Sequence, residues 1–279
     1  MVVYAGQGDA RRAMTLLWRD RRDRPEPAAP GRRPELSVDL VVETAVSVAD
    51  TDGMEALSMR AVGERLGRTA MSLYTYVASK NELVELMYDH AFGEPADAAE
   101  ADDSPDWRTA TEAWAHRLWD FYLRHPWTLE VSLARPVLGP NEYRLLESLA
   151  GVLHGAGLSP ARIRNTYGTL HNLVRGQVQT AAEARRAEAV TGVPEDEWWY
   201  ERSALLEEVA PDFTTRFPVL SAMAEAGAFV NETEDEPYLE QEARETFRSG
   251  LASVLDSLEA HLSPGDRGPR RADPDTTLT

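Results

Sequence analysis

The sequence of 279 residues contains no cysteine, which excludes disulfide bonds and zinc sites built from thiolates. It has no apolar run near the roughly 18 residues that a membrane-spanning helix requires, so we expect no membrane span. Its first residues lack the basic-then-apolar pattern of a secretory signal peptide. Together these absences predict a cytoplasmic protein that does not enter a membrane.

Sequence motifs of enzymes are absent as well. The chain has no His-Glu-x-x-His zinc motif, no Gly-x-Ser-x-Gly nucleophile motif and no phosphate-binding P-loop. A glycine-containing turn at residues 155–157 follows a predicted helix rather than a strand, unlike a dinucleotide-binding turn. We therefore predict a protein that is not an enzyme and that needs no cofactor and no metal.

Positive charge is scarce over most of the chain. The net charge is −18 at pH 7, which disfavours binding to nucleic acid if it is evenly spread. Residues 1–34 nevertheless carry +4, whereas residues 35–92 carry −6 and the remainder carries −16. A local basic surface near the N-terminus can therefore still contact phosphates.

Strict alternation of apolar and polar residues, which is typical of strands, is nearly absent, so the sequence predicts an all-α fold. Residues 1–34 are expected to form a basic arm and a proline-rich linker, and residues 35–92 a compact helical domain. Residues 93–262 are expected to form a larger helical domain, and residues 263–279 a disordered tail. The larger domain should open with a loop at 93–106 and contain helices at 107–125, 140–155, 159–189, 195–208, 212–229 and 238–262.

The most informative stretch is residues 57–77, which predicts two short helices joined by a tight turn. Apolar residues at 57, 61, 62 and 66 have helical spacing, and Gly67 follows where a residue with positive φ is needed. The second helix buries Leu73 and Val77 and has small or hydroxyl-bearing side chains at its N-terminus. Such an N-terminus suits close approach to a DNA groove and to phosphates.

These residues and their neighbours, from about Leu36 to Phe92, resemble the DNA-binding domain of the tetracycline-repressor (TetR) family of bacterial regulators. The matching patterns are Leu57-Ser58-Met59-Arg60 and Leu73-Tyr74-x-Tyr76-Val77-x-x-Lys80-x-Glu82-Leu83. The resemblance implies an N-terminal helix-turn-helix domain, followed by a larger helical domain for ligand binding and dimerisation. An ordinary small helical bundle with the same core spacing is the alternative.

The resemblance also implies which residues contact DNA. Arg60 matches a position where an arginine can bond the O6 and N7 atoms of guanine. Thr69, Ala70 and Met71 open the recognition helix, and the last two can pack only on apolar groups such as thymine methyls. The positions that match phosphate contacts are Ser72, Tyr74, Tyr76 and Lys80. An exposed surface side chain is the alternative for Arg60, and a structural ring is the alternative for Tyr74.

In the family, helices of the larger domain enclose a cavity for a small-molecule inducer, and aromatic side chains suit such a cavity. The resemblance implies ligand contacts by five residues on two predicted helices: Trp114, Leu118, Phe121, Tyr167 and His171. Plain core packing is the alternative for each of them. No residue matches the metal-ligating positions of the tetracycline repressor, so His171 is not expected to bind a metal.

A homodimer is implied too, through a four-helix bundle of the helices at 159–189 and 238–262 and their symmetry mates. The expected interface residues recur at helical spacing: Leu239, Ala243, Phe247, Gly250, Val254 and Leu258.

The N-terminal arm lies beyond the region of resemblance. Residues 10–24 carry six arginines around an apolar stretch that includes Leu16, Leu17 and Trp18. We expect the apolar side chains to dock on the protein and the arginines to face DNA; a purely structural arm is the alternative.

The sequence thus predicts a ligand-responsive transcriptional regulator, preferentially a repressor. It would bind a palindromic double-stranded DNA operator as a homodimer and be released by a small-molecule inducer. The alternative is a helical ligand-binding or protein-interaction module with a non-functional DNA head, because residues 35–92 are acidic and Ala70 and Met71 are apolar.

Overall fold

The computed structural model describes residues 3–19, 35–104, 106–230 and 236–262. Helices dominate this part of the chain, and its one extended pairing is an isolated bridge between Val3 and Val131. The all-α prediction is confirmed. The proline-rich linker at 25–34 and the predicted disordered tail at 263–279 lie outside the described residues. None of the described helices combines the length and the apolar character needed to cross a membrane.

The N-terminal part contains α1 (Ala10–Leu17), α2 (Val38–Ala56), α3 (Met59–Leu66), α4 (Ala70–Leu73) and α5 (Lys80–Glu100). The helices from α2 to α5 each begin at a hydroxyl side chain that accepts a hydrogen bond from a backbone N–H of the first turn. These N-caps are Ser37, Ser58, Thr69 and Ser79. Apolar side chains of the same helices form the core between them, among them the fully buried Val41, Val62, Leu73 and Leu83.

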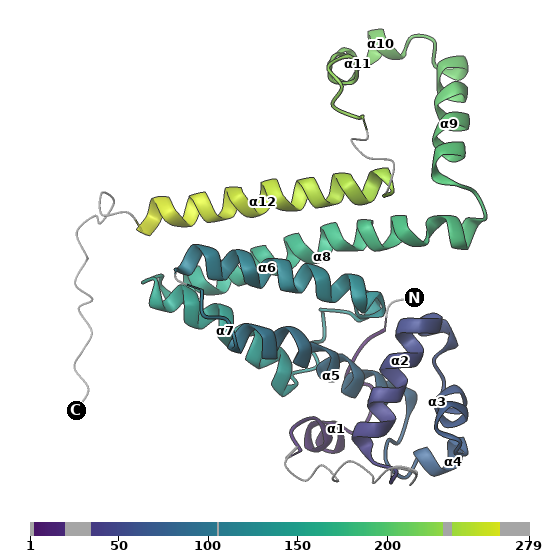
Figure 1. Ribbon diagram of the computed structural model, residues 1–279, viewed down its shortest axis with the longest axis vertical. Coiled ribbons are helices and arrows are strands. Elements are labelled where there is room, and N and C mark those ends of the chain that lie inside the picture. The colour runs from purple at the N-terminus through teal and green to yellow at the C-terminus, as the bar shows by residue number, and fades with distance from the viewer. Residues whose placement is uncertain (1–2, 20–34, 105, 231–235, 263–279) are drawn as a thin grey trace.

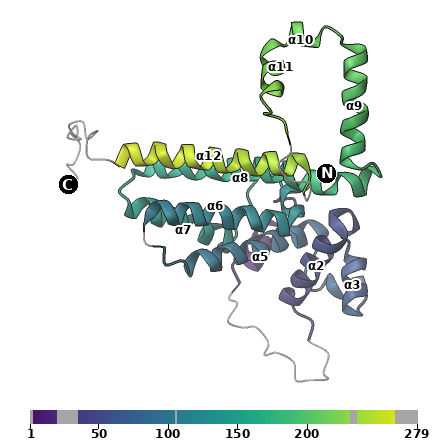
Figure 2. The ribbon, with the colours of Figure 1, turned by 45° about the horizontal axis from the view of Figure 1, so that its top comes forward.

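The larger body consists of α6 (Trp107–Arg124), the 3₁₀ helix η2 (Pro126–Glu130), α7 (Pro140–Gly155), α8 (Pro160–Thr191) and α12 (Tyr238–Leu262). Helices α8 and α12 lie side by side, and α6 and α7 pack against α8 (Figures 1 and 2). Between α8 and α12 the chain forms a projecting arm of α9 (Glu195–Val209), α10 (Phe213–Arg216) and α11 (Pro218–Glu225). No residue of these three helices is buried.

The predicted loop at 93–106 is wrong for residues 93–100, because α5 continues to Glu100 with Pro95 inside it. Proline lacks the N–H that would bond the preceding turn, which costs a helix about 3 kcal/mol. Burial outweighs this cost, since Phe92 and Ala96 are at most 2% exposed. The boundary predicted after residue 92 therefore lies inside α5, and this one helix joins the two domains.

The single helix predicted at 212–229 is wrong as well, because α10 and α11 are separate helices. Pro218 separates them: the residue before a proline is disfavoured in the helical region, and Phe217 adopts φ −127° and ψ 61°. Pro218 itself stands in the first turn of α11, where a missing N–H costs nothing.

The residues of α12 predicted for a dimer interface are divided between interior and surface. Ala243 and Phe247 are at most 2% exposed and pack inside the single chain, whereas Leu258, 4% exposed, lines a surface groove together with Val254. The ring of Phe247 stacks on Trp119 of α6, with centroids 4.8 Å apart. The cause is that α12 presents its apolar face to α6 and α8.

Gly250 has a different role from the one predicted. We expected it to let a second chain approach, but it faces Leu173 of α8 in the same chain. A Cβ atom at Gly250 would lie 3.0 Å from two carbon atoms of the Leu173 side chain. The other two predicted interface residues, Leu239 and Val254, are partly buried.

Candidate DNA-binding face and ligand site

The turn between α3 and α4 has the geometry that the sequence predicts. Gly67 ends α3 with φ 63° and ψ 38°, the left-handed conformation that glycine adopts without strain. The backbone N–H of Arg68 donates to the carbonyl of Gly63, 2.8 Å away, and this closes the turn. A Cβ atom at Gly63 would lie 2.8 Å from the carbonyl oxygen of Arg68. The local sequence pattern gives no sign of the role of Gly63, because the reason for a glycine there lies in the following turn.

The predicted DNA contacts fall into an exposed group and a partly buried group. Met71 is 77% exposed and Tyr74 is 45% exposed, and Arg60 and Thr69 are also on the surface. The four partly buried residues are Ala70, Ser72, Tyr76 and Lys80.

The partly buried group makes contacts inside the domain. The Ser72 hydroxyl donates to the Thr69 carbonyl at 2.7 Å, and Lys80 Nζ lies 3.5 Å from the Met54 carbonyl oxygen. Tyr76 and Ala70 pack against the core. The Lys80 ammonium group keeps further donors that can reach a phosphate.

Acidic side chains accompany the basic ones on this face. Arg60 Nε donates to Glu64 Oε1 at 2.8 Å, and Arg65 pairs with Asp52 at 2.9 Å. Glu64 and its hydrogen bond to Arg60 raise the pKa of that guanidinium group, which is charged in any case. The Nη groups of Arg60 can still bond guanine O6 and N7, but Glu64 holds Nε and its negative charge opposes the approach of DNA, so Glu64 competes with DNA for Arg60.

Polar side chains meet in the interior of the body, where α5, α6, α7 and α8 converge. The Tyr122 hydroxyl lies 3.2 Å from His171 Nε2, and the Tyr167 ring stacks on the His171 ring with centroids 5.6 Å apart. The Arg175 guanidinium group lies 5.8 Å from the centroid of the Tyr122 ring. Tyr88 of α5 is linked to Tyr122 through the ring of Phe92, with centroids 4.7 and 6.2 Å apart, and the charge of Glu142 of α7 acts on the same groups. We call this set the polar cluster: Tyr88, Tyr122, Glu142, Tyr167, His171 and Arg175.

Burial reinforces the neutral state that the rings of the polar cluster have at pH 7. Burial first, and the charge of Arg175 second, lower the pKa of His171 to about 4. Burial also raises the pKa of Tyr122 to about 12 and raises those of Tyr88 and Tyr167. The neutral imidazole can accept a hydrogen bond from Tyr122, and the tyrosine hydroxyls can donate to an oxygen of a ligand.

Of the five predicted ligand residues, Tyr167 and His171 belong to the polar cluster. Trp114 borders it: its ring contacts Tyr167 edge to face at 5.8 Å, and its Nε1 donates to the Leu145 carbonyl. Leu118 and Phe121 are completely buried in the core.

Four members of the cluster were not predicted as ligand residues: Tyr88 and Glu142 come from other helices, Arg175 from another turn of α8, and Tyr122 directly follows the predicted Phe121. The sequence offered a signal for Arg175 alone, because it lies one helical turn after His171.

Arg175 also holds the segment that follows α6. Its guanidinium group donates to the carbonyls of Thr128, Leu129 and Val131, at 3.4, 2.6 and 2.9 Å. Next to this segment, His125 lies between Asp50 of α2, 2.8 Å from Nδ1, and Glu94 of α5, 3.2 Å from Nε2. The polar cluster is therefore connected to the contact between the two domains.

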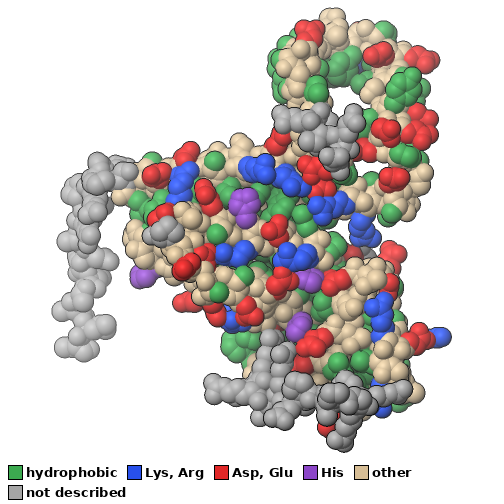
Figure 3. All heavy atoms as spheres, viewed as in Figure 1, with side chains coloured by type: hydrophobic (Ala, Val, Ile, Leu, Met, Phe, Trp, Pro, Cys, Tyr) green, Lys and Arg blue, Asp and Glu red, His purple; other side chains and the backbone are tan. Residues whose placement is uncertain are grey.

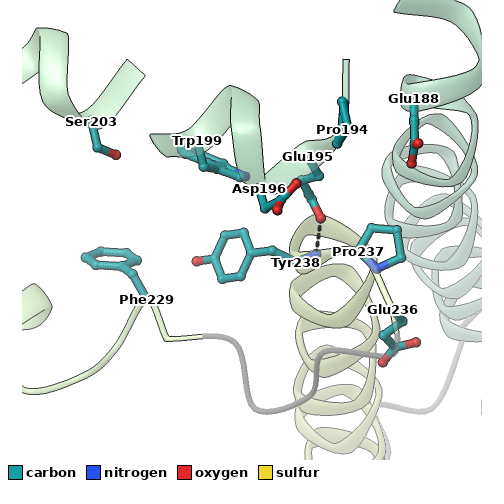
Figure 4. A pocket seen from close by; sticks show the side chains of 10 residues that line it. All are labelled: Glu188, Pro194, Glu195, Asp196, Trp199, Ser203, Phe229, Glu236, Pro237 and Tyr238. Atoms are coloured by element: carbon teal, nitrogen blue, oxygen red, sulfur yellow. Dashed lines mark hydrogen bonds between the residues drawn. The ribbon is translucent and has the colours of Figure 1, made fainter. Parts of the chain in front are cut away.

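A separate hollow lies between the projecting arm of α9 to α11 and the start of α12 (Figure 4). It has a volume of about 1030 Å³ and contains none of the predicted ligand residues. Aromatic rings of Trp199, Phe229 and Tyr238 line it, together with four acidic residues. Figure 3 shows further acidic side chains over the arm and the body. Among the described residues, no three His, Asp or Glu side chains are grouped so that they could hold a metal ion.

Comparison with known proteins agrees with this geometry. Residues 41–87 match the family of bacterial regulatory proteins called tetR, and residues 99–262 match the tetracyclin repressor-like C-terminal domain. The HTH-type transcriptional repressor DrrR1 of Streptomyces coeruleorubidus is 34% identical over 255 residues, which cover 91% of this chain and 87% of that protein. The HTH-type transcriptional repressor Rv1353c of Mycobacterium tuberculosis is 24% identical over 229 residues, 81% of each chain.

Solved structures have the same fold. The transcriptional regulator SCO7222, a TetR from Streptomyces coelicolor, superposes with a TM-score of 0.61 at 25% identity, over 82% of this chain and all of that one. ActR of Streptomyces coelicolor in complex with actinorhodin gives a TM-score of 0.62 at 24% identity, with the same coverage. The matches to both domains and the 34% identity to a repressor along most of its length place this chain in the tetracycline-repressor family of bacterial transcriptional regulators.

Proposed function

We propose that the protein is a repressor that binds a palindromic operator as a homodimer and leaves the DNA when a small molecule occupies the polar cluster. One observation carries this proposal. Helix α5 directly follows residues 69–79, which we call the recognition element, and it contributes Tyr88 to the polar cluster. A ligand that moves Tyr88 therefore also moves the DNA-binding face. Work on chromosomal DNA would place the protein in the cytoplasm.

The ligand acts by a shift of populations. It would replace the Tyr122–His171 hydrogen bond with contacts of its own and favour a conformer whose two recognition elements no longer fit successive major grooves. An apolar or amphipathic molecule with a few oxygen acceptors suits neutral tyrosine hydroxyls within an aromatic wall. The hollow beside the arm is a weaker candidate, because its lining residues come from α8, the arm and α12 and none comes from α5.

For the homodimer we propose the outer faces of α8 and α12, a surface that keeps Val254 and Leu258 of the interface predicted from the sequence and leaves out the enclosed Ala243 and Phe247. Small polar side chains are exposed there, which lets helices approach closely: Asn165, Thr169, Asn172, Ser249, Ser253 and Ser257. Four of these six line a groove of about 580 Å³ between the two helices, which a helix of a second copy could fill.

DNA binding to the region upstream of the protein's own gene tests the proposal. We expect a shifted band that corresponds to one dimer on a palindromic site, and loss of the shift with the Arg60→Ala variant. Absence of any specific complex with this region or with DNA selected from random sequence would favour the alternative, a ligand-binding or protein-interaction module with a non-functional DNA head.

A further inference from the structure

The N-terminal segment at residues 3–19 contacts both domains, although it precedes both regions of family similarity (Figure 1). On the side of the body, the Val3 N–H donates to the Glu130 carbonyl at 2.9 Å, and the Ser132 N–H donates to the Val3 carbonyl at 2.8 Å. Further along, Trp18 Nε1 donates to the Leu138 carbonyl at 3.0 Å. Leu138 has φ 61°, which strains a leucine, so this bond secures an unfavourable conformation.

On the side of the DNA-binding domain, the contacts involve buried carboxylates. Arg12 Nε donates to Glu82 Oε1 at 3.0 Å, and Arg12 Nη2 lies 3.4 Å from the Tyr76 carbonyl oxygen. The Gly6 N–H donates to Glu85 Oε1 at 2.7 Å. Glu82 and Glu85 are only 5% and 6% exposed. Arg12 is thus the counter-charge of a buried carboxylate at the junction of the recognition element and α5.

Glu82 explains why this junction matters. Its other carboxylate oxygen accepts a hydrogen bond from the Ala78 N–H, and its own N–H donates to the Ser79 hydroxyl. Ser79 thus caps the first turn of α5, and the Glu82 carboxylate fastens Ala78, the residue before the cap, to the same turn. A change in the position of Glu82 therefore changes the orientation of the recognition element relative to α5.

The same segment also reaches the polar cluster. Val131 pairs with Val3 in the isolated bridge, and the Val131 carbonyl accepts a hydrogen bond from Arg175. One stretch of chain, residues 128–132, thus binds the polar cluster on one side and the N-terminal segment on the other. Helix α1 has eight residues, too few to be stable alone, so its order depends on these contacts.

We propose that residues 3–19 form a strap that holds the DNA-binding domain in its operator-competent orientation, with Arg12 as the positioning residue. The strap connects movement of residues 128–132 to the recognition element by a route separate from α5. This inference rests on the proposed function for its DNA readout. It modifies our sequence-based expectation for two of the six arginines, because Arg12 and Arg19 bind the carboxylates of Glu82 and Asp39. Arg11 is exposed, and Arg21, Arg22 and Arg24 lie outside the described residues.

The test compares Arg12→Ala with Arg11→Ala in the full chain. Both variants remove one positive charge from α1, but Arg11 is exposed and its side chain makes no contact described here. The probe is a DNA duplex that the wild-type protein selects from random sequence. We expect Arg12→Ala to bind about tenfold more weakly at every salt concentration, with an unchanged salt slope. A slope reduced by about one per half-site would make Arg12 a phosphate contact and overturn the proposal, as would affinity within twofold of wild type.

Hydrogen exchange separates this proposal from the proposed function. We expect faster exchange of the backbone amides of residues 76–83 in Arg12→Ala than in Arg11→Ala. The same amides should exchange faster in Val3→Pro, which removes the N–H donated to Glu130 at the far end of the strap. Faster exchange confined to residues 128–132 in Val3→Pro would overturn the strap. If the wild-type protein selects no DNA, the proposed function fails, and the exchange measurement still tests the strap.

Discussion

At the scale of single residues, Glu64 and DNA compete for the Arg60 side chain on the DNA-binding face. Replacement of Arg60 by alanine should weaken operator binding about 10- to 100-fold and relax the preference at one base position per half-site. Replacement of Glu64 by glutamine should instead strengthen binding a few-fold, because it removes a negative charge and leaves only a weaker, neutral acceptor beside Arg60. Fluorescence anisotropy with matched and mismatched duplexes measures both effects. Equal affinity of Arg60→Ala and wild type on every duplex would contradict the assigned contact.

A second prediction at this scale concerns His125, which contacts carboxylates of both domains. Burial alone lowers the pKa of His125, but hydrogen bonds and charges of Asp50 and Glu94 outweigh it, so the pKa is raised. The resulting stabilisation is fully present below the unfolded value of about 6.5 and is lost as the pH rises through the folded pKa. The melting temperature of wild type should therefore exceed that of His125→Gln by more at pH 6 than at pH 8.

The comparison with His125→Gln also removes the contribution of His171. That residue has a lowered pKa, so its contribution has the opposite sign and is lost as the pH falls from about 6.5 towards 4. Both proteins contain His171, and the difference between them reports His125 alone. A difference in melting temperature that does not change with pH would exclude the proposed ion pairs.

At the scale of secondary-structure elements, the α3–α4 turn depends on a glycine inside a helix. Gly63→Ala should destabilise the protein by about 1–3 kcal/mol, because the new methyl group meets the Arg68 carbonyl oxygen and the backbone must shift. The matched control is Gly151→Ala in α7, where a Cβ atom meets nothing within 4 Å and alanine should stabilise the helix by up to about 1 kcal/mol. Urea denaturation measures both changes. A neutral Gly63→Ala variant would contradict the close approach.

For several helices, sequence patterns were sufficient to predict where the helix begins. Proline, glycine and hydroxyl caps predicted the starts of helices such as α7 and α8, because these signals act on adjacent backbone groups. They failed at Pro95, where burial of neighbouring side chains outweighed a local helix breaker. They also failed at Pro218, where the apolar periodicity ran on across a proline that divides the helix. Local signals thus predicted most helices, and at Pro95 packing against distant residues outweighed them.

At the scale of the whole molecule, the proposed dimer interface predicts different outcomes for two variants of α12: one should unfold, and the other should stay folded but not dimerise. Phe247→Glu places a charge beside Trp119 inside the single chain, so it should unfold the protomer at a cost of at least about 3 kcal/mol. Ser253→Arg adds a large charged side chain to the exposed groove and should yield folded monomers. Circular dichroism reports folding, and sedimentation at micromolar concentration reports association. A folded dimer of Ser253→Arg would exclude this interface.

The candidate sites were predictable to different degrees for the same physical reason. The DNA-binding face comes from one continuous stretch, so residues 57–77 were sufficient to recognise it. The polar cluster comes from four helices, and Tyr88, Glu142 and Arg175 meet only after these helices pack. For α12 the sequence could not separate residues that pack within the chain from residues open to a second chain, because the apolar periodicity is the same in both cases.

The uninterrupted course of α5 has a mechanical consequence. Tyr88 lies eight residues after Lys80, which at about 1.5 Å per residue separates them by about 12 Å along a rigid rod. If the rod pivots by about 10° at Tyr88, its Lys80 end travels about 2 Å, enough to break hydrogen bonds whose lengths vary by only about 0.5 Å. In a homodimer both α5 helices pivot, so the distance between the two recognition elements changes by up to twice that amount. Because the helix amplifies motion in this way, a sub-ångström shift of the buried rings can decide whether both protomers bind their major grooves at the same time.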